Sequence, residues 1–244
     1  MYEWRATDLA IRRGRHILSD HPIAGWVKAE TRYGRHIAFA QPAGNTRGVV
    51  LTCTTRMRAL ALRRRCPICG CALPRKAPVY RQFPTSYEGQ AGVFAASGAS
   101  PMHRSCALYS VLCCPWLRLP SARGRKGGLL RGPMVIRGFA TFGLMLTERM
   151  VTGEEGFLTY AYVETLEVID SGSGWRDILP AYEQSLADEI DLRTRLHWDD
   201  SPEDEQRLAD DARMDLMTLN ELWEISVPFA SDNEFAPGER AVLI

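Results

Sequence analysis

The chain has 244 residues, of which 45% are hydrophobic and 24% are charged, and its formal net charge is +1. This composition can fill a globular core, and the length suits one large domain or two small ones. No run of 18 apolar residues occurs, which excludes a membrane-spanning helix. The first residues lack the apolar core of a signal peptide, and seven cysteines, an odd number, suit a reducing cytoplasm better than a disulfide framework.

The small net charge hides a strong separation of charge along the chain. Residues 1–150 hold 24 Lys+Arg against 6 Asp+Glu, a net +18, whereas residues 151–244 hold 6 against 23, a net −17. A basic half attracts the phosphates of DNA or RNA. An acidic half can shield that surface, repel nucleic acid or bind a basic protein partner.

The N-terminal part is predicted to contain short helices and strands. Residues 6–18 suggest a helix, residues 25–31 and 35–40 alternate as a hairpin, and residues 49–54 form another strand candidate. A helix then extends through residue 65 and is the most basic segment of the chain. Its candidate nucleic-acid contacts are Arg56, Arg58, Arg63, Arg64 and Arg65. A solvated amphipathic helix is the alternative interpretation.

Four potential metal ligands follow, in two pairs with the same spacing. Cys66 and Cys69 form a C-x-x-C pair, and His103 and Cys106 form an H-x-x-C pair at the start of an apolar run. A two-residue gap lets a tight turn direct both sulfurs at one ion, and Gly70 can adopt the positive φ that such a turn often needs. Residues three apart share a helix face. The pattern therefore predicts a structural Zn²⁺ site in a treble-clef-like module.

Two other interpretations of these cysteines remain open. A C-x-x-C pair can be a redox pair, which requires a helix directly after it, and Pro74 argues against that helix. The thiols can also be ordinary buried groups. Within the zinc interpretation, Cys71 is a possible substitute ligand, because C-G-C offers the metal a second choice.

The motif resembles that of a family of uncharacterised proteins found in actinobacteria and their phages. The shared pattern is C-x-x-C-G, a long spacer, P-x-H-x-x-C-A and C-P-x-L. The matching residues are Cys66, Cys69, Gly70, Pro101, His103, Cys106, Ala107, Cys114, Pro115 and Leu117. Relatives carry G-P-M before the histidine, where this chain has Ala99-Ser100-Pro101-Met102. The resemblance supports the four metal ligands and supplies no activity, because the family has no established function.

Two segments around the second ligand pair are irregular and carry basic residues. Residues 72–100 mix prolines and glycines with aromatic and basic residues, and such aromatics either stack on unpaired bases or anchor a loop to the core. Residues 118–132 form a glycine-rich connector, which is either a phosphate-binding arm or a solvated linker. Its candidate nucleic-acid contacts are Arg123, Arg125 and Lys126.

The acidic half is predicted to fold as a β-hairpin followed by helices. Residues 134–150 and 156–169 are rich in β-formers and are separated by a Gly-Glu-Glu-Gly turn. Helices follow from Trp175 or Pro180 and, after a serine cap, from Ser201.

No motif in the chain identifies a reaction. G-x-S-x-G, H-E-x-x-H and G-x-G-x-x-G are all absent, and no histidine lies between Cys69 and His103 to serve an H-N-H nuclease. An enzyme whose residues converge only in the fold therefore remains a third hypothesis.

The sequence as a whole predicts an α+β protein in which a zinc-stapled module is joined to a β-hairpin or sheet with C-terminal helices. The expected regions are a basic N-terminal region (1–132) containing the zinc module (63–117), a hairpin with acidic helices (133–228) and a tail (229–244). The leading hypothesis is a non-enzymatic nucleic-acid-binding or regulatory protein that acts through its basic half. The second is a protein-interaction module in which the acidic helices, residues 181–224, engage a basic partner.

Overall fold

The computed structural model describes residues 54–84, 94–97, 100–113, 134–153, 158–170, 175–185, 190–196, 202–228 and 240–244. Its elements are α4 (Thr54–Leu62), β1 (Val79–Pro84), β2 (Phe94–Ser97), α5 (Arg104–Cys113), β3 (Met134–Leu146), α7 (Glu148–Val151), β4 (Thr159–Asp170), α8 (Trp175–Ser185), η2 (Leu192–Thr194), α9 (Pro202–Ile225), β5 (Val227–Pro228) and β6 (Arg240–Leu243). The elements predicted before residue 54 and the connector at 118–132 lie outside this part of the chain. Helices and an antiparallel sheet together make an α+β fold, as predicted.

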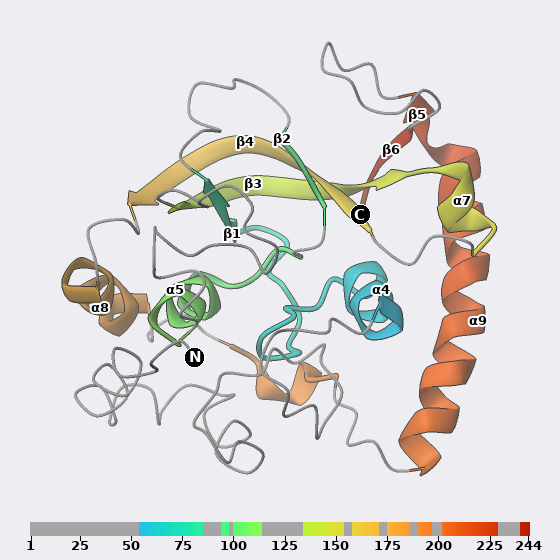
Figure 1. Cartoon of the computed structure of the whole chain (residues 1–244), viewed down its shortest axis with the longest axis horizontal. Coiled ribbons are helices and arrows are strands. Elements are labelled where there is room, and N and C mark those ends of the chain that lie inside the picture. Colours follow the sequence, from blue (N-terminus) through green and yellow to red (C-terminus); the bar gives the residue numbers. More distant parts are fainter. Residues whose placement is uncertain are drawn as a thin grey trace, which may run out of the picture.

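β3 is the centre of a six-stranded sheet (Figure 1). One edge of β3 pairs with β4, and the other pairs first with β1 and then with β6. β2 continues the sheet beyond β4, and β5 continues it beyond β6. Strands from before and after residue 132 therefore belong to one sheet, so the predicted boundary at 132/133 does not separate two sheets.

The β3–β4 hairpin confirms the predicted pair of long strands, but the first strand is shorter than expected. β3 ends at Leu146, and Thr147 caps the short helix α7 by accepting a hydrogen bond from the Met150 N–H at 3.3 Å. The prediction of a strand through residue 150 is therefore wrong, because a threonine followed by Glu148 is a helix start that competes with the strand.

The core lies between the sheet and the helices drawn beneath it in Figure 1, with α5 and α8 on that side. Aromatic rings from three strands meet there. The ring centroids of Phe139 and Tyr162 are 4.8 Å apart, and the Phe83 ring forms T-shaped pairs with both, at centroid distances of 5.6 and 5.7 Å. All three side chains are at most 1% exposed, as are Leu60 and Leu108 of the adjacent helices. Burial of this kind is the main stabilising contribution to such a fold.

The C-terminal part contains the predicted helix but ends differently from the prediction. α9 runs from Pro202 to Ile225, in agreement with the predicted helix. The predicted loose tail does not hold for residues 240–243, because they form β6 against β3. Gly143 permits this pairing, since a Cβ there would lie 2.3 Å from the Val242 carbonyl oxygen. Among the described helices, none is long and apolar enough to cross a membrane.

Candidate metal centre

Cys66 and Cys69 lie in a tight turn just after α4. The Cys66 N–H donates to the Cys71 carbonyl at 2.9 Å, and the Gly70 N–H donates to the Cys66 carbonyl at 2.8 Å. Gly70 has φ of +74°, which residues with a Cβ adopt only at a cost. The backbone therefore closes the turn that carries the first two thiols, as the spacing predicts.

The second ligand pair is placed by the start of α5. The His103 carbonyl accepts a hydrogen bond from the Ala107 N–H at 2.9 Å, so the first helical turn begins at His103 and brings Cys106 onto the same side. Just before it, Met102 exchanges two backbone hydrogen bonds with Tyr80 of β1, at 2.8 and 2.9 Å. The helix entry is thus fixed to the sheet.

The structure brings all four predicted ligands together. One ligand atom from each of Cys66, Cys69, His103 and Cys106 lies within 4.8 Å of the others. His103 Nδ1 is 3.4 Å from the Cys69 sulfur and 3.9 Å from the Cys106 sulfur. A tetrahedral zinc ion, with Zn–S of about 2.3 Å and Zn–N of about 2.0 Å, separates its ligand atoms by roughly 3.5–3.8 Å. The two His103 distances are close to this separation, and the four atoms lie near enough to one another to surround a single metal ion.

The histidine has the second contact that metal-binding histidines usually make. His103 Nε2 lies 2.9 Å from the Ala72 carbonyl oxygen, which can only accept a hydrogen bond. Nε2 therefore carries the proton, and the lone pair of Nδ1 faces the sulfurs. Such a contact fixes the ring orientation and increases the basicity of the ligating nitrogen.

The thiols titrate as one buried cluster. Burial raises the pKa of the Cys106 thiol, and hydrogen bonding with Cys106 and Cys66 raises the pKa of Cys69. Burial also acts to raise the pKa of Cys66, but hydrogen bonds from Cys106, Cys69 and His103 outweigh it and lower that pKa. A cation is needed for all three sulfurs to become thiolates together.

Cys71 is buried beside this cluster but lies outside the four-residue group. Its side chain is fully buried, and its thiol is oriented toward the Cys69 carbonyl oxygen at 3.6 Å.

The metal-binding turn is also held in place by residues 190–196. The Leu196 N–H donates to the Gly70 carbonyl and the Ala72 N–H donates to the Thr194 hydroxyl, both at 2.9 Å.

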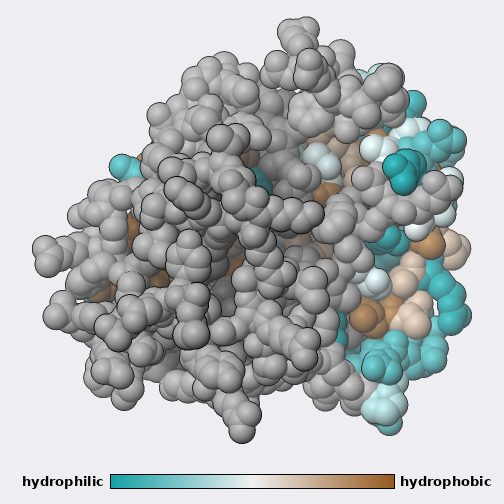
Figure 2. Space-filling view, in the orientation of Figure 1, coloured by the Kyte–Doolittle hydropathy of each residue, from teal (hydrophilic) through white to brown (hydrophobic). Residues whose placement is uncertain are grey.

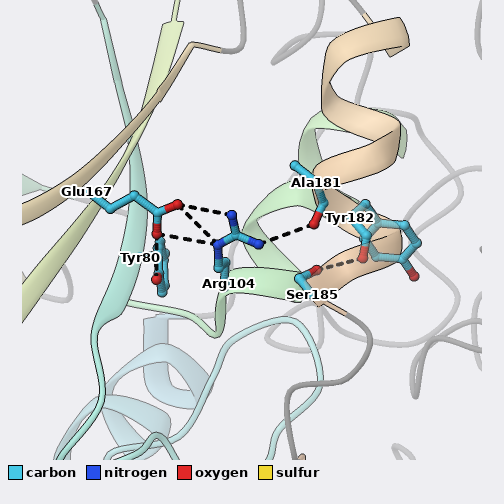
Figure 3. Close-up of polar contacts among 6 residues, drawn as sticks. All are labelled: Tyr80, Arg104, Glu167, Ala181, Tyr182 and Ser185. Carbon is cyan, nitrogen blue, oxygen red and sulfur yellow. Dashed lines mark hydrogen bonds and ion pairs between the residues drawn. The ribbon is translucent and has the colours of Figure 1, made fainter.

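Arg104, the first residue of α5, lies between the ligands His103 and Cys106 in sequence and connects the metal centre to the sheet and to α8 (Figure 3). Its guanidinium donates to both carboxylate oxygens of Glu167 on β4 at 3.0–3.3 Å, and to the Ala181 carbonyl at 3.2 Å. The Tyr80 hydroxyl donates to the same carboxylate at 2.8 Å. Burial acts to raise the pKa of Glu167, but the hydrogen bonds from Arg104 and Tyr80 outweigh it and lower that pKa.

Replacing Glu167 by glutamine will reduce stability by about 1 kcal/mol at neutral pH, because this partly exposed carboxylate stabilises the fold only when ionised. Its folded pKa is depressed, so the contribution is present above the unfolded value of roughly 4.3 and is lost as the pH falls through the folded pKa. Urea denaturation measured from pH 7 to pH 3 should therefore show that the difference in free energy of unfolding between wild type and Glu167→Gln shrinks as the pH falls. The control Glu164→Gln, on an exposed position of the same strand, should follow wild type throughout; a constant gap for Glu167→Gln would contradict the assignment.

Two arginines predicted as phosphate contacts are buried in α4. Arg56 is 4% exposed and Arg58 is 8% exposed. Arg63 donates to two carboxylates of α9, at 2.8 Å to Asp211 and 2.6 Å to Asp215. The basic and acidic halves of the chain therefore meet at the α4–α9 contact, where part of the charge separation is neutralised.

The next two arginines also make internal contacts. Arg64 stacks on the ring of Phe142, with 4.5 Å between the guanidinium carbon and the ring centroid, and it donates to the Ile244 carbonyl. Arg65 donates to the Thr194 carbonyl. The partners of these arginines are distant in sequence, which is why the basic composition of the helix did not reveal them.

Arg123, Arg125 and Lys126 lie outside the described residues. The contacts of Ala72, Thr194 and Glu167 around the centre were not anticipated; only the position of Arg104 between two ligands was a local signal for them. No model of a known protein family matches the chain, and neither a search of curated proteins nor one of solved structures finds a match.

Proposed function

We propose that Cys66, Cys69, His103 and Cys106 bind one Zn²⁺ ion as the structural centre of a treble-clef-like module. The observation that carries this proposal is the convergence of four donor atoms within 4.8 Å in the protein interior. The three cysteines are fully buried and the histidine is 7% exposed. Catalytic zinc usually keeps one position for water, whereas four protein ligands are typical of structural zinc. The ion would stabilise the fold without meeting a substrate.

Cobalt substitution tests the ligand set directly. Protein refolded with Co²⁺ is expected to bind one ion per chain and to show the strong visible absorption of a tetrahedral thiolate complex, because three sulfurs and one nitrogen surround the site. Native mass spectrometry of the untreated protein should find one zinc per chain. His103→Ala should weaken both signals. A weak spectrum typical of octahedral cobalt, or no stoichiometric binding, would exclude the proposed coordination.

We further propose that the protein is a cytoplasmic, non-enzymatic nucleic-acid-binding protein that acts through its basic N-terminal half. Arg75 and Lys76 are exposed in the bend that follows the metal-binding turn. Burial and the nearby charge of Arg75 lower the pKa of Arg64, so like charges are gathered beside the centre. A phosphate backbone is the ligand that such a gathering favours.

The contacts described above divide the candidate residues into two groups. Arg56, Arg58 and Arg63 contribute to the fold, since they are buried or paired with carboxylates. The proposed phosphate-binding residues are Arg64, Arg65, Arg75, Lys76, Arg123, Arg125 and Lys126. A surface of this kind binds phosphates in general and carries no sequence specificity of its own.

Binding of labelled single- and double-stranded DNA and RNA at two salt concentrations tests this proposal. Arg75→Ala with Lys76→Ala should weaken binding and reduce the slope of log K against log salt by about 1 for each contact removed. The control, Arg207→Ala with Arg213→Ala, removes the same charge from the acidic helix α9 and should not weaken binding. The proposal fails if wild type does not bind at low salt, or if both double variants lose the same affinity.

A further inference from the structure

α9 presents two different faces, and only one is used by the fold. Its inner face packs against α4, α7 and β6. Leu219 is fully buried on that face, and Asp215 is 2% exposed. Leu208, Leu216 and Leu222 are partly buried beside the core. This stripe accounts for the amphipathic pattern that predicted the helix.

The outward face carries two large apolar side chains that the fold does not use. Met214 is 56% exposed and Met217 is 57% exposed. Residues three apart on a helix are neighbours on one side, so the two thioethers form a continuous patch. In Figure 2, hydrophobic atoms interrupt the hydrophilic surface on the right, where α9 lies in Figure 1. Methionine side chains are flexible and polarisable, which suits them to contact partners of varied shape.

Acidic side chains flank this patch. Asp210 precedes Met214 by four residues, and Glu221 and Glu224 follow Met217 by four and seven, so all three share its side of the helix. All three residues are exposed. Asp210 has Arg213 at 3.3 Å, whereas Glu221 and Glu224 form no ion pair with any described residue.

Beyond the first turn of α9, its acids therefore divide into two sets with different roles. Asp211 and Asp215 face α4 and are neutralised by Arg63. In the outward set, Asp210 pairs only with the exposed Arg213, and Glu221 and Glu224 form no ion pair with a described residue; the three carboxylates flank the exposed thioethers. Because the inner contacts are satisfied within the chain, the negative charge left on the outer face is available to a second molecule.

We propose that the outward face of α9, formed by Asp210, Met214, Met217, Glu221 and Glu224, docks a basic amphipathic helix of a protein partner. Apolar side chains of that helix would pack on the two thioethers, and its lysines or arginines would lie against the flanking carboxylates. Helix-on-helix docking of this kind uses apolar contacts at a spacing of three or four residues, which the methionine pair supplies. The same negative face repels nucleic acid, so this surface is distinct from the proposed phosphate-binding surface.

A synthetic fluorescent peptide of leucine, lysine and alanine with one apolar helical stripe serves as the probe for the full-length protein. It is titrated by anisotropy at two salt concentrations, beside a scrambled peptide of the same composition that has no stripe. Two variants test the surface: Met214→Gln with Met217→Gln, and Glu221→Gln with Glu224→Gln. The matched control is Leu166→Gln with Val168→Gln, which replaces an exposed apolar pair of β4 at 52% and 53% exposure.

The striped peptide should bind at least about tenfold more tightly than the scrambled one, and each α9 variant should lose about tenfold in affinity. The charge variant should also lose most of its salt dependence, whereas the control pair should bind like wild type. The variants should fold, because all substituted side chains are exposed, and thermal denaturation checks this. Equal binding of both peptides, equal losses in the β4 control, or self-association that the methionine substitutions abolish would each overturn the proposal.

Discussion

Replacing Cys106 by serine will release the metal and unfold the segment that connects α4, the metal-binding turn and α5. Cys106 is fully buried, and serine keeps the shape of the side chain while replacing the metal-binding sulfur by a smaller oxygen. Metal binding contributes roughly 10–16 kcal/mol to folding in small structural zinc peptides. A whole domain is stable by only about 5–15 kcal/mol. Losing even part of the metal contribution therefore removes most of the stability.

Circular dichroism melts and native mass spectrometry measure this effect, and a chelator should reproduce it in the wild-type protein. The matched control is Cys71→Ser, because Cys71 is equally buried and lies in the same turn. This variant should keep one zinc per chain and lose about 1–3 kcal/mol from the buried hydroxyl. If zinc is lost from Cys71→Ser and retained in Cys106→Ser, Cys71 is the fourth ligand.

Replacing Asp215 by alanine is expected to destabilise the protein by about 1–3 kcal/mol, because it removes the closest carboxylate of the half-buried Arg63 guanidinium, which keeps only Asp211. Asp215 is 2% exposed and lies 2.6 Å from Arg63. Burial raises the pKa of the Asp215 carboxyl, and the hydrogen bond from Arg63 opposes that rise. Chemical denaturation at pH 7 gives the loss directly.

Two further variants separate the ion pair from general effects of the helix. Asp210→Ala removes an exposed carboxylate from the same helix and should change stability by less than about 0.5 kcal/mol. Asp215→Leu combined with Arg63→Met replaces both partners by apolar groups and should recover much of the loss. If the double variant loses as much stability as Asp215→Leu and Arg63→Met lose separately when their losses are added, Arg63 and Asp215 do not act as a pair.

The metal ligands could be predicted from the sequence because each pair is local. Cys66 and Cys69 need only a closed turn, and His103 and Cys106 need only one helical turn. α9 could be predicted equally well, since Pro202 and the acids after it mark a helix start. Each of these signals lies within a few residues of the feature it predicts.

The partners of strands and arginines could not be predicted in the same way. β1 and β2 both precede α5, yet β1 pairs with β3 and β2 pairs with β4. Strand partners depend on how whole faces pack, which short patterns do not encode. Arg56 and Arg58 were candidate phosphate contacts because of their charge, but both side chains are buried, and arginine stems bury well when the head finds a partner.

The pairing of β3 with β1 and β6 has a consequence for folding. Val79 pairs with Phe139, and Gly143 pairs with Leu243, so neighbours in the sheet are 60 and 100 residues apart along the chain. Such distant contacts slow folding, because long loops must close before any pairing stabilises them. A chain cut at residue 132 would leave β1 and β2 as open edges, which favour aggregation. The described elements are therefore expected to fold and unfold together, so a substitution that destabilises one half of the chain also destabilises the other half.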